Sequence, residues 1–425
     1  MKKIILVLFL FLSCYIIYNS TEKKEISCLV IGDLIADNKY IKDNNIITEY
    51  NNTYINENYR IKDIINIIKY NEELENNNKK ISIHRLMKTT DILIISIGMN
   101  DIYSKLNNDT KKIYTYINNM VKDMDLLLDK INLGNRPIKV IYDCGNGTTS
   151  IIADQIFANL NVESIPLYNI SDGTFPNHHP DPCVYKNLTK LKEKVLETNA
   201  DLGIGYDGDG DRVGFIDNLG NMIETDKFMI IMWRYLYDKV DNKKALFDVK
   251  CTKALEDELH KLEITPIEYR TGNSYTRAAT AEGNFPLGGE LSGHVYFRDK
   301  FPGYDDGIYA GLRLIELLSN TDKPLNTLLD GINKYYSTEE LKVRVEDEVK
   351  FKVIEKMHQY CLKQNYSFLT IDGVKAKFDD GFALVRASNT GPNITMRFEA
   401  TTEKRLQELQ DEFTNELNRC IEETK

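Results

Sequence analysis

The 425-residue chain lacks the paired cysteines of a disulfide framework or a zinc site. Its seven cysteines are scattered singly, and no CxxC motif occurs. An odd, scattered set of this kind is typical of reduced thiols. The sequence therefore favours a reducing compartment for most of the chain.

The chain also lacks an excess of basic residues. Lysine and arginine number 54 against 64 acidic residues, which gives a formal net charge of -10 and a pI near 5.3. Because nucleic-acid-binding domains carry a basic surface, we predict no nucleic-acid partner. Hydrophobic residues make up 42% and charged residues 28%, as in soluble globular proteins. A chain of this length is expected to hold several domains.

Proline is absent from residues 25–133, where Asn, Ile, Lys and Tyr dominate. Before this segment, two lysines precede an apolar run over residues 4–18. Such a start predicts a secretory signal or a short membrane anchor over residues 1–20, with a buried core helix as the alternative. Membrane attachment through residues 4–18 conflicts with a reducing compartment, so the sequence leaves the localisation open between cytoplasmic and anchored or exported.

Residues 21–133 have the pattern of an α/β fragment. We predict strands at residues 27–31 and 91–97, each ending in a polar turn, and a helix over residues 111–131. The two turns resemble those of SGNH (GDSL-type) hydrolases. However, Leu34 stands where that family has its nucleophilic serine, and the later Asp-x-x-His is missing. We therefore favour an inert α/β fragment over a hydrolase.

Residues 205–212 alternate aspartate and glycine. Asp207, Asp209 and Asp211 stand at positions i, i+2 and i+4, which points all three carboxylates to one side of an extended segment. Carboxylates this close repel one another, and a hard cation such as Mg²⁺ relieves the repulsion. An EF-hand is excluded because loop position 6 would be Arg212. Apolar flanks predict a strand-loop-strand, and the alternative is an acidic surface turn.

This stretch resembles the metal loop of the phosphohexomutases, the phosphomannomutase and phosphoglucomutase family. Four further stretches resemble signatures of that family and follow in the family's order. They are residues 143–147, 173–182, 289–294 and 386–393. The resemblance extends from about residue 135 to the end of the chain.

The resemblance implies a multi-domain α/β protein with mostly three-layer α/β domains and a small C-terminal α+β domain. We place family domain 2, with the metal loop, at residues 134–223, and domain 3, with the sugar-recognition loop, at residues 224–336. A charged link over residues 337–350 leads into domain 4, with the phosphate loop, at residues 345–425.

The resemblance also implies roles for single residues, with Mg²⁺ as cofactor and mannose or glucose 1- or 6-phosphate as substrate. Asp207, Asp209 and Asp211 would hold the metal, and the catalytic cations would be Arg212 and Lys250. The substrate-binding residues would be Glu290, Ser292, His294, Arg386, Ser388, Asn389 and Thr390.

Two departures from the family stand out. The phosphoserine loop, a Thr-x-Ser-His-Asn type of sequence, does not occur in the chain, and Asn273 stands where the family has a histidine. We therefore expect magnesium and sugar-phosphate binding with little or no turnover as an isomerase that transfers phosphate intramolecularly. Alternatives are an enzyme whose first domain comes from another chain, a non-catalytic membrane-tethered binding module, and a fusion artefact with a hydrolase-derived leader.

Three other polar or amphipathic features receive structural interpretations. Asp305 and Asp306 precede a helix and are predicted to cap it. His178 and His179 are predicted to pack within a loop, because no recognised zinc spacing surrounds them. Residues 406–421 are predicted to form a helix that only packs.

Overall fold

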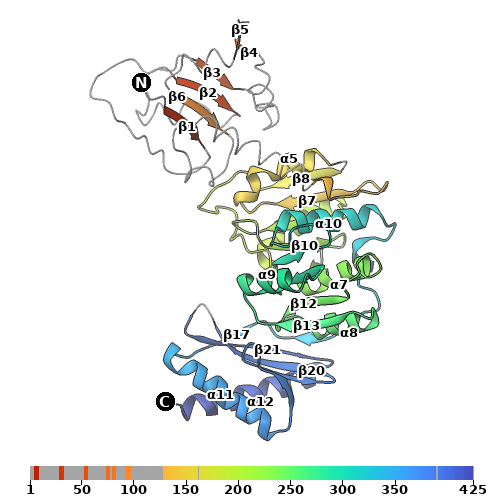
Figure 1. Ribbon diagram of the computed structural model, residues 1–425, viewed down its shortest axis with the longest axis vertical. Helices are drawn as coiled ribbons and strands as arrows, with labels where there is room; N and C mark the ends of the chain where they lie inside the picture. Colours follow the sequence, from red (N-terminus) through yellow and green to blue (C-terminus); the bar gives the residue numbers. More distant parts are fainter. Residues whose placement is uncertain are drawn as a thin grey trace, which may run out of the picture. The chain divides into compact units, whose positions relative to one another are not determined.

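The computed structural model describes residues 128–160, 162–388 and 391–424, together with six strands within residues 4–96 (Figure 1). The chain divides into two compact units. The first comprises residues 1–131, 144–161 and 168–179, and the second comprises residues 132–143, 162–167 and 180–425. The sheets and helices described below confirm the predicted multi-domain α/β class.

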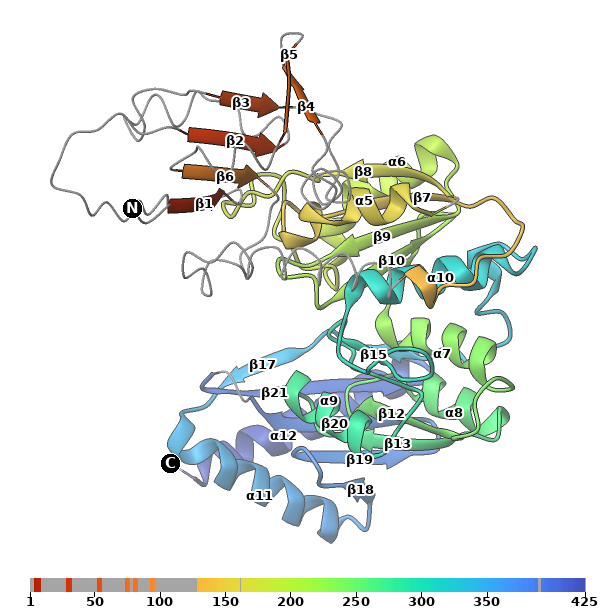
Figure 2. The same ribbon diagram turned by 45° about the horizontal axis from the view of Figure 1, so that its top comes forward.

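The first unit contains a parallel sheet. Its strands, in the order β1-β6-β2-β3, are β1 (Ile4–Leu8), β6 (Ile92–Ser96), β2 (Cys28–Gly32) and β3 (Asn52–Ile55), and Figure 2 shows them side by side. A separate hairpin joins β4 (Glu73–Asn76) to β5 (Lys79–Ser82). The strands predicted at residues 27–31 and 91–97 are confirmed as β2 and β6.

Of the predicted leader over residues 1–20, the structure describes only Ile4–Leu8, which form strand β1. The rest of the leader, the turn with Leu34, and most of the helix predicted over residues 111–131 lie outside the described residues. Among the residues that are described, no helix is both long enough and apolar enough to span a bilayer.

A second sheet carries the aspartate loop. Its order is β11-β10-β9-β7-β8, with β7 (Lys139–Asp143), β8 (Glu163–Leu167) and β9 (Leu202–Tyr206) parallel, and β10 (Val213–Asp217) and β11 (Met222–Ile223) antiparallel. Helix α6 (Thr189–Thr198) buries Leu191 and Val195 against Ile141 and Ile216 of the sheet. The strand-loop-strand predicted around the aspartates is confirmed. Along the chain, β7 is followed by a 3-10 turn, η3 (Thr148–Ile151), and by helix α5 (Ala153–Ala158).

The third sheet has the order β13-β12-β14-β15. Strands β12 (Lys244–Asp248), β13 (Thr265–Tyr269) and β14 (Leu287–Gly289) are parallel, and β15 (Val295–Phe297) is antiparallel. Its helices are α7 (Thr225–Leu236), α8 (Lys253–Lys261), α9 (Asn273–Glu282) and α10 (Gly307–Ser319). Helix α10 is buried on all sides because it packs against β9 and β10 as well as β15. This helix joins the second and third sheets into one body.

The C-terminal sheet runs in the order β16-β21-β20-β19-β18, and β17 pairs with β21. The strands are β16 (Tyr336–Ser337), β17 (Leu341–Arg344), β18 (Ser367–Leu369), β19 (Val374–Phe378), β20 (Gly381–Ala387) and β21 (Asn393–Ala400). Residues 337–350 were predicted to be a charged link, and this prediction is wrong. They contribute β17, antiparallel to β21, and the first turn of helix α11 (Asp347–Lys363).

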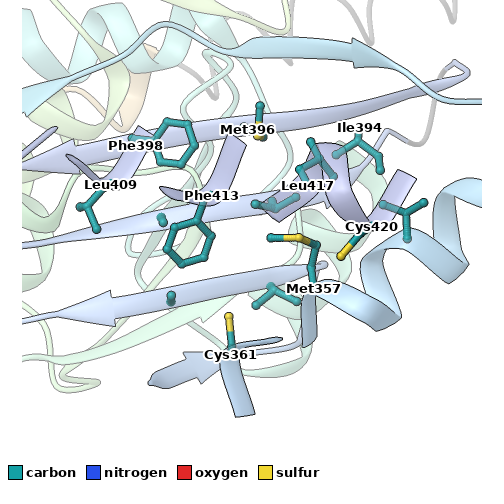
Figure 3. Packing of buried hydrophobic residues seen from close by; sticks show 14 of the residues in the cluster. Met357, Cys361, Ile394, Met396, Phe398, Leu409, Phe413, Leu417 and Cys420 are labelled. Atoms are coloured by element: carbon teal, nitrogen blue, oxygen red, sulfur yellow. The ribbon is translucent and has the colours of Figure 1, made fainter. Parts of the chain in front are cut away.

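Helices α11 and α12 (Glu403–Glu422) cover one face of this sheet, the face turned away from β12 and β13 in Figure 1. Figure 3 shows the core between them, in which Phe413 and Leu417 of α12 meet Met357 of α11 and Phe398 of β21. The helix predicted over residues 406–421 and its packing role are confirmed.

The opposite face of the sheet rests on the third domain. Phe382 and Leu384 of β20 pack against Val249, which follows β12. Beside them, Lys375 and Lys377 of β19 pair with Glu268 of β13, the second at 2.7 Å. Along β19 and β20, the strand alternation therefore sends valine and alanine side chains to the helices and lysine, phenylalanine and leucine side chains to the neighbouring domain.

Glu399 of β21 lies in this contact and yields a pH prediction. Its buried side chain accepts a hydrogen bond from the Lys253 backbone N–H at 2.6 Å, and burial raises its pKa from 4.5 to about 7. The folded state therefore keeps a proton that the unfolded state releases, so the free energy of unfolding falls as the pH rises from about 4.5 toward 7. Between pH 5 and pH 8, the free energy of unfolding of Glu399→Gln is expected to rise by about 1–3 kcal/mol relative to that of the parent.

Urea unfolding at the two pH values measures this difference. Glu422→Gln, at an exposed carboxylate at the end of α12, is the matched control and should show no pH-dependent gain. A Glu399→Gln variant whose stability relative to the parent is the same at both pH values would contradict the assignment of a protonated Glu399.

Candidate functional site

The aspartate loop between β9 and β10 brings its three carboxylates together. Asp207, Asp209 and Asp211 each offer an oxygen within 4.8 Å of the others. Asp207 is buried, and its Oδ1 accepts hydrogen bonds from the backbone N–H groups of Gly210 at 2.9 Å and Arg212 at 3.1 Å. These two bonds curl the loop, and Gly210 permits the turn because its φ is 83°.

The carboxylates of this trio resist ionising together. Burial raises the pKa of Asp209, and the negative charge of Asp207 raises it further. Burial also raises the pKa of Asp211, which Asp209 and Asp305 reinforce while His294 opposes. Crowded carboxylates with raised pKa values and only oxygen donors fit a hard divalent cation such as Mg²⁺.

Arg212 is held beside the trio as a fixed cation. Its Nε donates to Asp207 Oδ2 at 2.7 Å, and its Nη1 donates to Asp181 Oδ1 at 3.4 Å. Burial opposes the charge, but the hydrogen bond to Asp207 outweighs it and raises the pKa of Arg212 above its usual value. The guanidinium therefore stays charged next to the aspartate loop.

The loop over residues 289–294 docks on the aspartate loop. The Val213 N–H donates to the Gly293 carbonyl at 3.1 Å, and Arg212 and His294 form an isolated β-bridge. Gly293 has a φ of 103°, and a Cβ there would lie 3.0 Å from the Arg212 Cβ, so only glycine fits. The Gly307 N–H, at the start of α10, donates to the Gly210 carbonyl at 2.9 Å and fixes the other side of the loop.

His294, Asn273 and Asp305 form a polar cluster next to Asp211. His294 Nδ1 lies 2.9 Å from Asp305 Oδ2, and the Asn273 amide donates to both Asp305 and Asp211. Burial opposes protonation of His294, but the hydrogen bond to Asp305 outweighs it and raises the pKa of the imidazole. The prediction that Asp305 caps α10 is wrong, because Asp306 caps it by accepting from the Tyr309 N–H at 2.9 Å.

The buried carboxylate of Asp248, at the end of β12, holds the loop that carries Glu290 and Ser292. Asp248 accepts hydrogen bonds from the Leu291 N–H at 3.1 Å and from Thr271 Oγ1 at 2.9 Å. Glu290 is 1% exposed and accepts from the Gly272 N–H at 3.2 Å and from Ser292 Oγ at 3.4 Å. Burial raises the pKa of Glu290, and the charge of Asp248 adds to the effect.

Lys250 follows β12 and lies, like Asp248, at the carboxyl end of this strand. Its Nζ is 3.1 Å from Glu340 Oε1 and 3.9 Å from Asp248 Oδ2. Burial works against the charge, but these two carboxylates outweigh it and raise the pKa of Lys250. The lysine is therefore a buried cation with carboxylate partners on both sides.

In the phosphate loop, Arg386 is buried and donates from Nε to Asp372 Oδ2 at 2.9 Å. The Ser388 N–H donates to the Asn393 carbonyl at 2.8 Å, and Lys350 Nζ donates to the Ser388 carbonyl at 2.8 Å. Asn389 and Thr390, which were also predicted to bind phosphate, lie outside the described residues.

Three consecutive residues link the loops of the site, either directly or through Asp372. Thr271 donates from its side chain to Asp248 and from its N–H to Asp372 Oδ2 at 2.9 Å, and Asp372 also holds Arg386. The Gly272 N–H reaches Glu290, and the Asn273 amide reaches Asp211. Residues 271–273, which we call the hub, thus connect the aspartate loop with the loop over residues 289–294 and, through Asp372, with Arg386.

The sequence is similar to a known family over three ranges. Residues 114–220 match the family model for phosphoglucomutase/phosphomannomutase alpha/beta/alpha domain II, residues 224–335 match domain III, and residues 340–416 match the C-terminal domain. The chain is 38% identical over 317 residues to the phosphomannomutase/phosphoglucomutase of Pseudomonas syringae pv. tomato, and the match covers 74% of this chain and 68% of that protein.

This chain belongs to the phosphoglucomutase/phosphomannomutase family. A second relative from Pseudomonas aeruginosa is 39% identical over 66% of this chain, and the chain spans 61% of that relative's length. A crystal structure of a phosphoglucomutase/phosphomannomutase family protein from Burkholderia thailandensis has a TM-score of 0.65 and 26% identity, and the match covers 93% of this chain and 89% of that one.

The comparisons give the SGNH resemblance of residues 21–133 no support. The match to domain II begins at residue 114, ahead of the boundary predicted at residue 134. The hydrolase resemblance stays a prediction, and its Leu34 turn lies outside the described residues. His178 lies edge-on to Tyr168 at 5.4 Å between ring centroids, as expected of a histidine that packs within its loop.

Proposed function

We propose that this chain binds a hexose phosphate together with Mg²⁺ and is a phosphohexomutase whose own turnover is small or absent. The observation that carries the proposal is the hub over residues 271–273, because it joins a carboxylate trio, a sugar-type loop and a buried arginine into one polar site. Such an arrangement suits a ligand that has hydroxyls at its centre and a phosphate at either end.

In this proposal, each group of residues binds a different part of the ligand. Asp207, Asp209 and Asp211 would hold the cation, which when bound neutralises charge that develops on a phosphoryl group. Arg212 and Lys250 would contact the phosphate next to the metal. Glu290, Ser292 and His294 would bind sugar hydroxyls, and Arg386, Ser388, Asn389 and Thr390 would bind the distal phosphate.

The protonation states support this division. Arg212 and Lys250 keep their charges because carboxylates hold both, so they present cations to a phosphate without needing a proton. His294, with its raised pKa, presents a donor toward the sugar while Asp305 holds its Nδ1. Glu290 accepts hydrogen bonds from two sides and can accept more from vicinal hydroxyls.

Phosphoryl transfer within one sugar needs a group that carries the phosphate between its ends. The family's phosphoserine loop does not occur in this sequence, and Asn273 cannot shuttle a proton at neutral pH. We therefore propose strong binding with little mutase activity. The second candidate, an enzyme completed by a first domain from another chain, is favoured by the same absence.

Calorimetry and a coupled assay on the purified chain test the proposal. Glucose 6-phosphate or mannose 6-phosphate should bind with one-to-one stoichiometry in the presence of Mg²⁺, and conversion of glucose 1-phosphate should be at least a thousandfold slower than with a complete family member. Adding a separately expressed first domain of such a member separates the two candidates. Rapid turnover by the chain alone, or no heat with either sugar phosphate, would refute the proposal.

A further inference from the structure

A cavity lies in the third domain, apart from the hub. It has a volume of about 350 Å³ and is formed by the end of α7, the turn before β12, the turn before β14 and the turn after β15. Cavities of roughly 300 to 1,000 Å³ are the size that small ligands occupy. The cavity is therefore large enough for a molecule with one or two rings.

The cavity and the hub lie at opposite ends of the same sheet. Asn242 of the cavity precedes β12, whereas Asp248 of the main site ends it. Likewise His294 precedes β15, and Arg298 of the cavity follows it. A strand of five residues separates the two ends by about 15 Å, so one small ligand does not occupy both.

The lining has a surplus of positive charge. It contains Lys239, Arg298, Lys300 and Arg313 against two carboxylates, Asp241 and Asp299. Two of these cations are neutralised, since Arg313 pairs with Asp299 at 2.7 Å and Lys300 with Glu316 at 2.7 Å.

Lys239 and Arg298 are held differently. Arg298 donates only to uncharged oxygens, those of Asn284 and Pro302, and Lys239 Nζ lies 3.1 Å from the centroid of the Tyr235 ring. Within residues 128–160, 162–388 and 391–424, neither cation forms an ion pair with a carboxylate. Both are thus available to an anion from outside the protein.

The lining also has an apolar and aromatic surface, beside the amides of Asn242 and Asn284. Tyr235, Leu236, Val240 and Pro286 supply this surface. Lys239 Nζ covers the centre of the Tyr235 ring, so the aliphatic side chains are the partner for a ligand ring. The two cations are the partner for a phosphate. An inorganic anion alone would leave most of the 350 Å³ to water.

We propose that this cavity binds a phosphate monoester of a ring-bearing small molecule, with the phosphate on Lys239 and Arg298 and the ring against the apolar lining. Burial and the charges of Lys300 and Arg313 lower the pKa of Lys239, although nearby carboxylates oppose them. A bound dianion removes this electrostatic penalty. The site is independent of the hexose phosphate proposed for the hub.

Calorimetry with AMP tests the cavity in an Arg386→Met background, in which the distal phosphate contact of the main site is removed. We expect one equivalent of AMP to bind, and adenosine, which lacks the phosphate, to bind at least tenfold more weakly. Lys239→Met should weaken AMP binding at least tenfold, and Arg298→Lys should weaken it less, because a cation remains. Since no carboxylate of the described residues pairs with the Lys239 side chain, its loss should leave the fold intact.

The matched control is Lys352→Met, which removes one exposed lysine from α11 and should leave AMP binding unchanged. Equal binding of AMP and adenosine, or equal binding by the parent and Lys239→Met, would overturn the proposal. If AMP does not bind, the cavity proposal fails, while binding of glucose 6-phosphate by the parent chain is unaffected. If the proposed function fails instead, the parent gives no heat with glucose 6-phosphate, and AMP still binds.

Discussion

Asp209→Asn combined with Asp211→Asn is expected to abolish Mg²⁺ binding and to raise the stability of the metal-free protein. The two substitutions remove two of three anionic oxygen donors but keep Asp207, whose hydrogen bonds shape the loop. At a magnesium concentration of 100 Kd, binding to the parent adds about 2.7 kcal/mol. That gain corresponds to a rise in Tm of roughly 5–10 °C, which the double variant should lack entirely.

The metal-free comparison sharpens this test. Burial and mutual repulsion raise the pKa values of Asp209 and Asp211, so their ionised forms destabilise the empty loop at neutral pH. Neutral asparagines remove that repulsion, and the variant should melt above the metal-free parent. Asp379→Asn with Asp411→Asn, at two exposed positions elsewhere, is the charge-matched control and should keep the full magnesium response. A magnesium-dependent rise in Tm that survives in the Asp209 and Asp211 variant would place the cation elsewhere.

The trio could be predicted from the sequence because its geometry is local. An i, i+2, i+4 spacing on an extended segment fixes which side the carboxylates take, whatever the rest of the fold does. The flanking apolar runs predicted two strands, and β9 and β10 are found there. Short-range rules therefore suffice where all the parts of a site lie within eight residues.

The hub could not be predicted in the same way. Thr271 and Asp372 are 101 positions apart, and only the packing of the fourth domain on the third brings them within 2.9 Å. One signal was present in the sequence at Asp305 and Asp306. A helix needs one N-cap residue, so two consecutive acids leave one side chain available for another contact. Asp306 is the cap, and Asp305 binds His294.

The segment over residues 337–350 shows a different limit. Leu341 and Val343 alternate with Lys342 and Arg344, a period of two that is typical of a strand with one exposed side. The high charge of this segment predicted a link, but the alternation of apolar and charged side chains is the pattern that matches the strand. Edge strands use charge of this kind to prevent association with other chains, and β17 pairs on one side only, with β21.

Arg386→Met is expected to weaken the binding of glucose 6-phosphate at least 30-fold. The substitution removes a buried guanidinium from the phosphate loop, and a hydrogen bond to a charged group contributes about 1.5–3 kcal/mol. It also leaves the Asp372 carboxylate without the arginine that holds it at 2.9 Å, so a negative charge then faces the incoming phosphate. Calorimetry at constant ionic strength measures the loss.

Two further variants distinguish a direct contact between Arg386 and the phosphate from a general effect of positive charge in the domain. Arg344→Met removes the same charge from a side chain that is 77% exposed in the same domain, and it should change the affinity less than twofold. Arg386→Met with Asp372→Asn removes the stranded carboxylate and should recover part of the loss, because the asparagine amide oxygen can still accept from the Thr271 N–H. If the arginine at position 344 matters as much as Arg386, the phosphate is attracted by general charge, and the fourth domain holds no phosphate site.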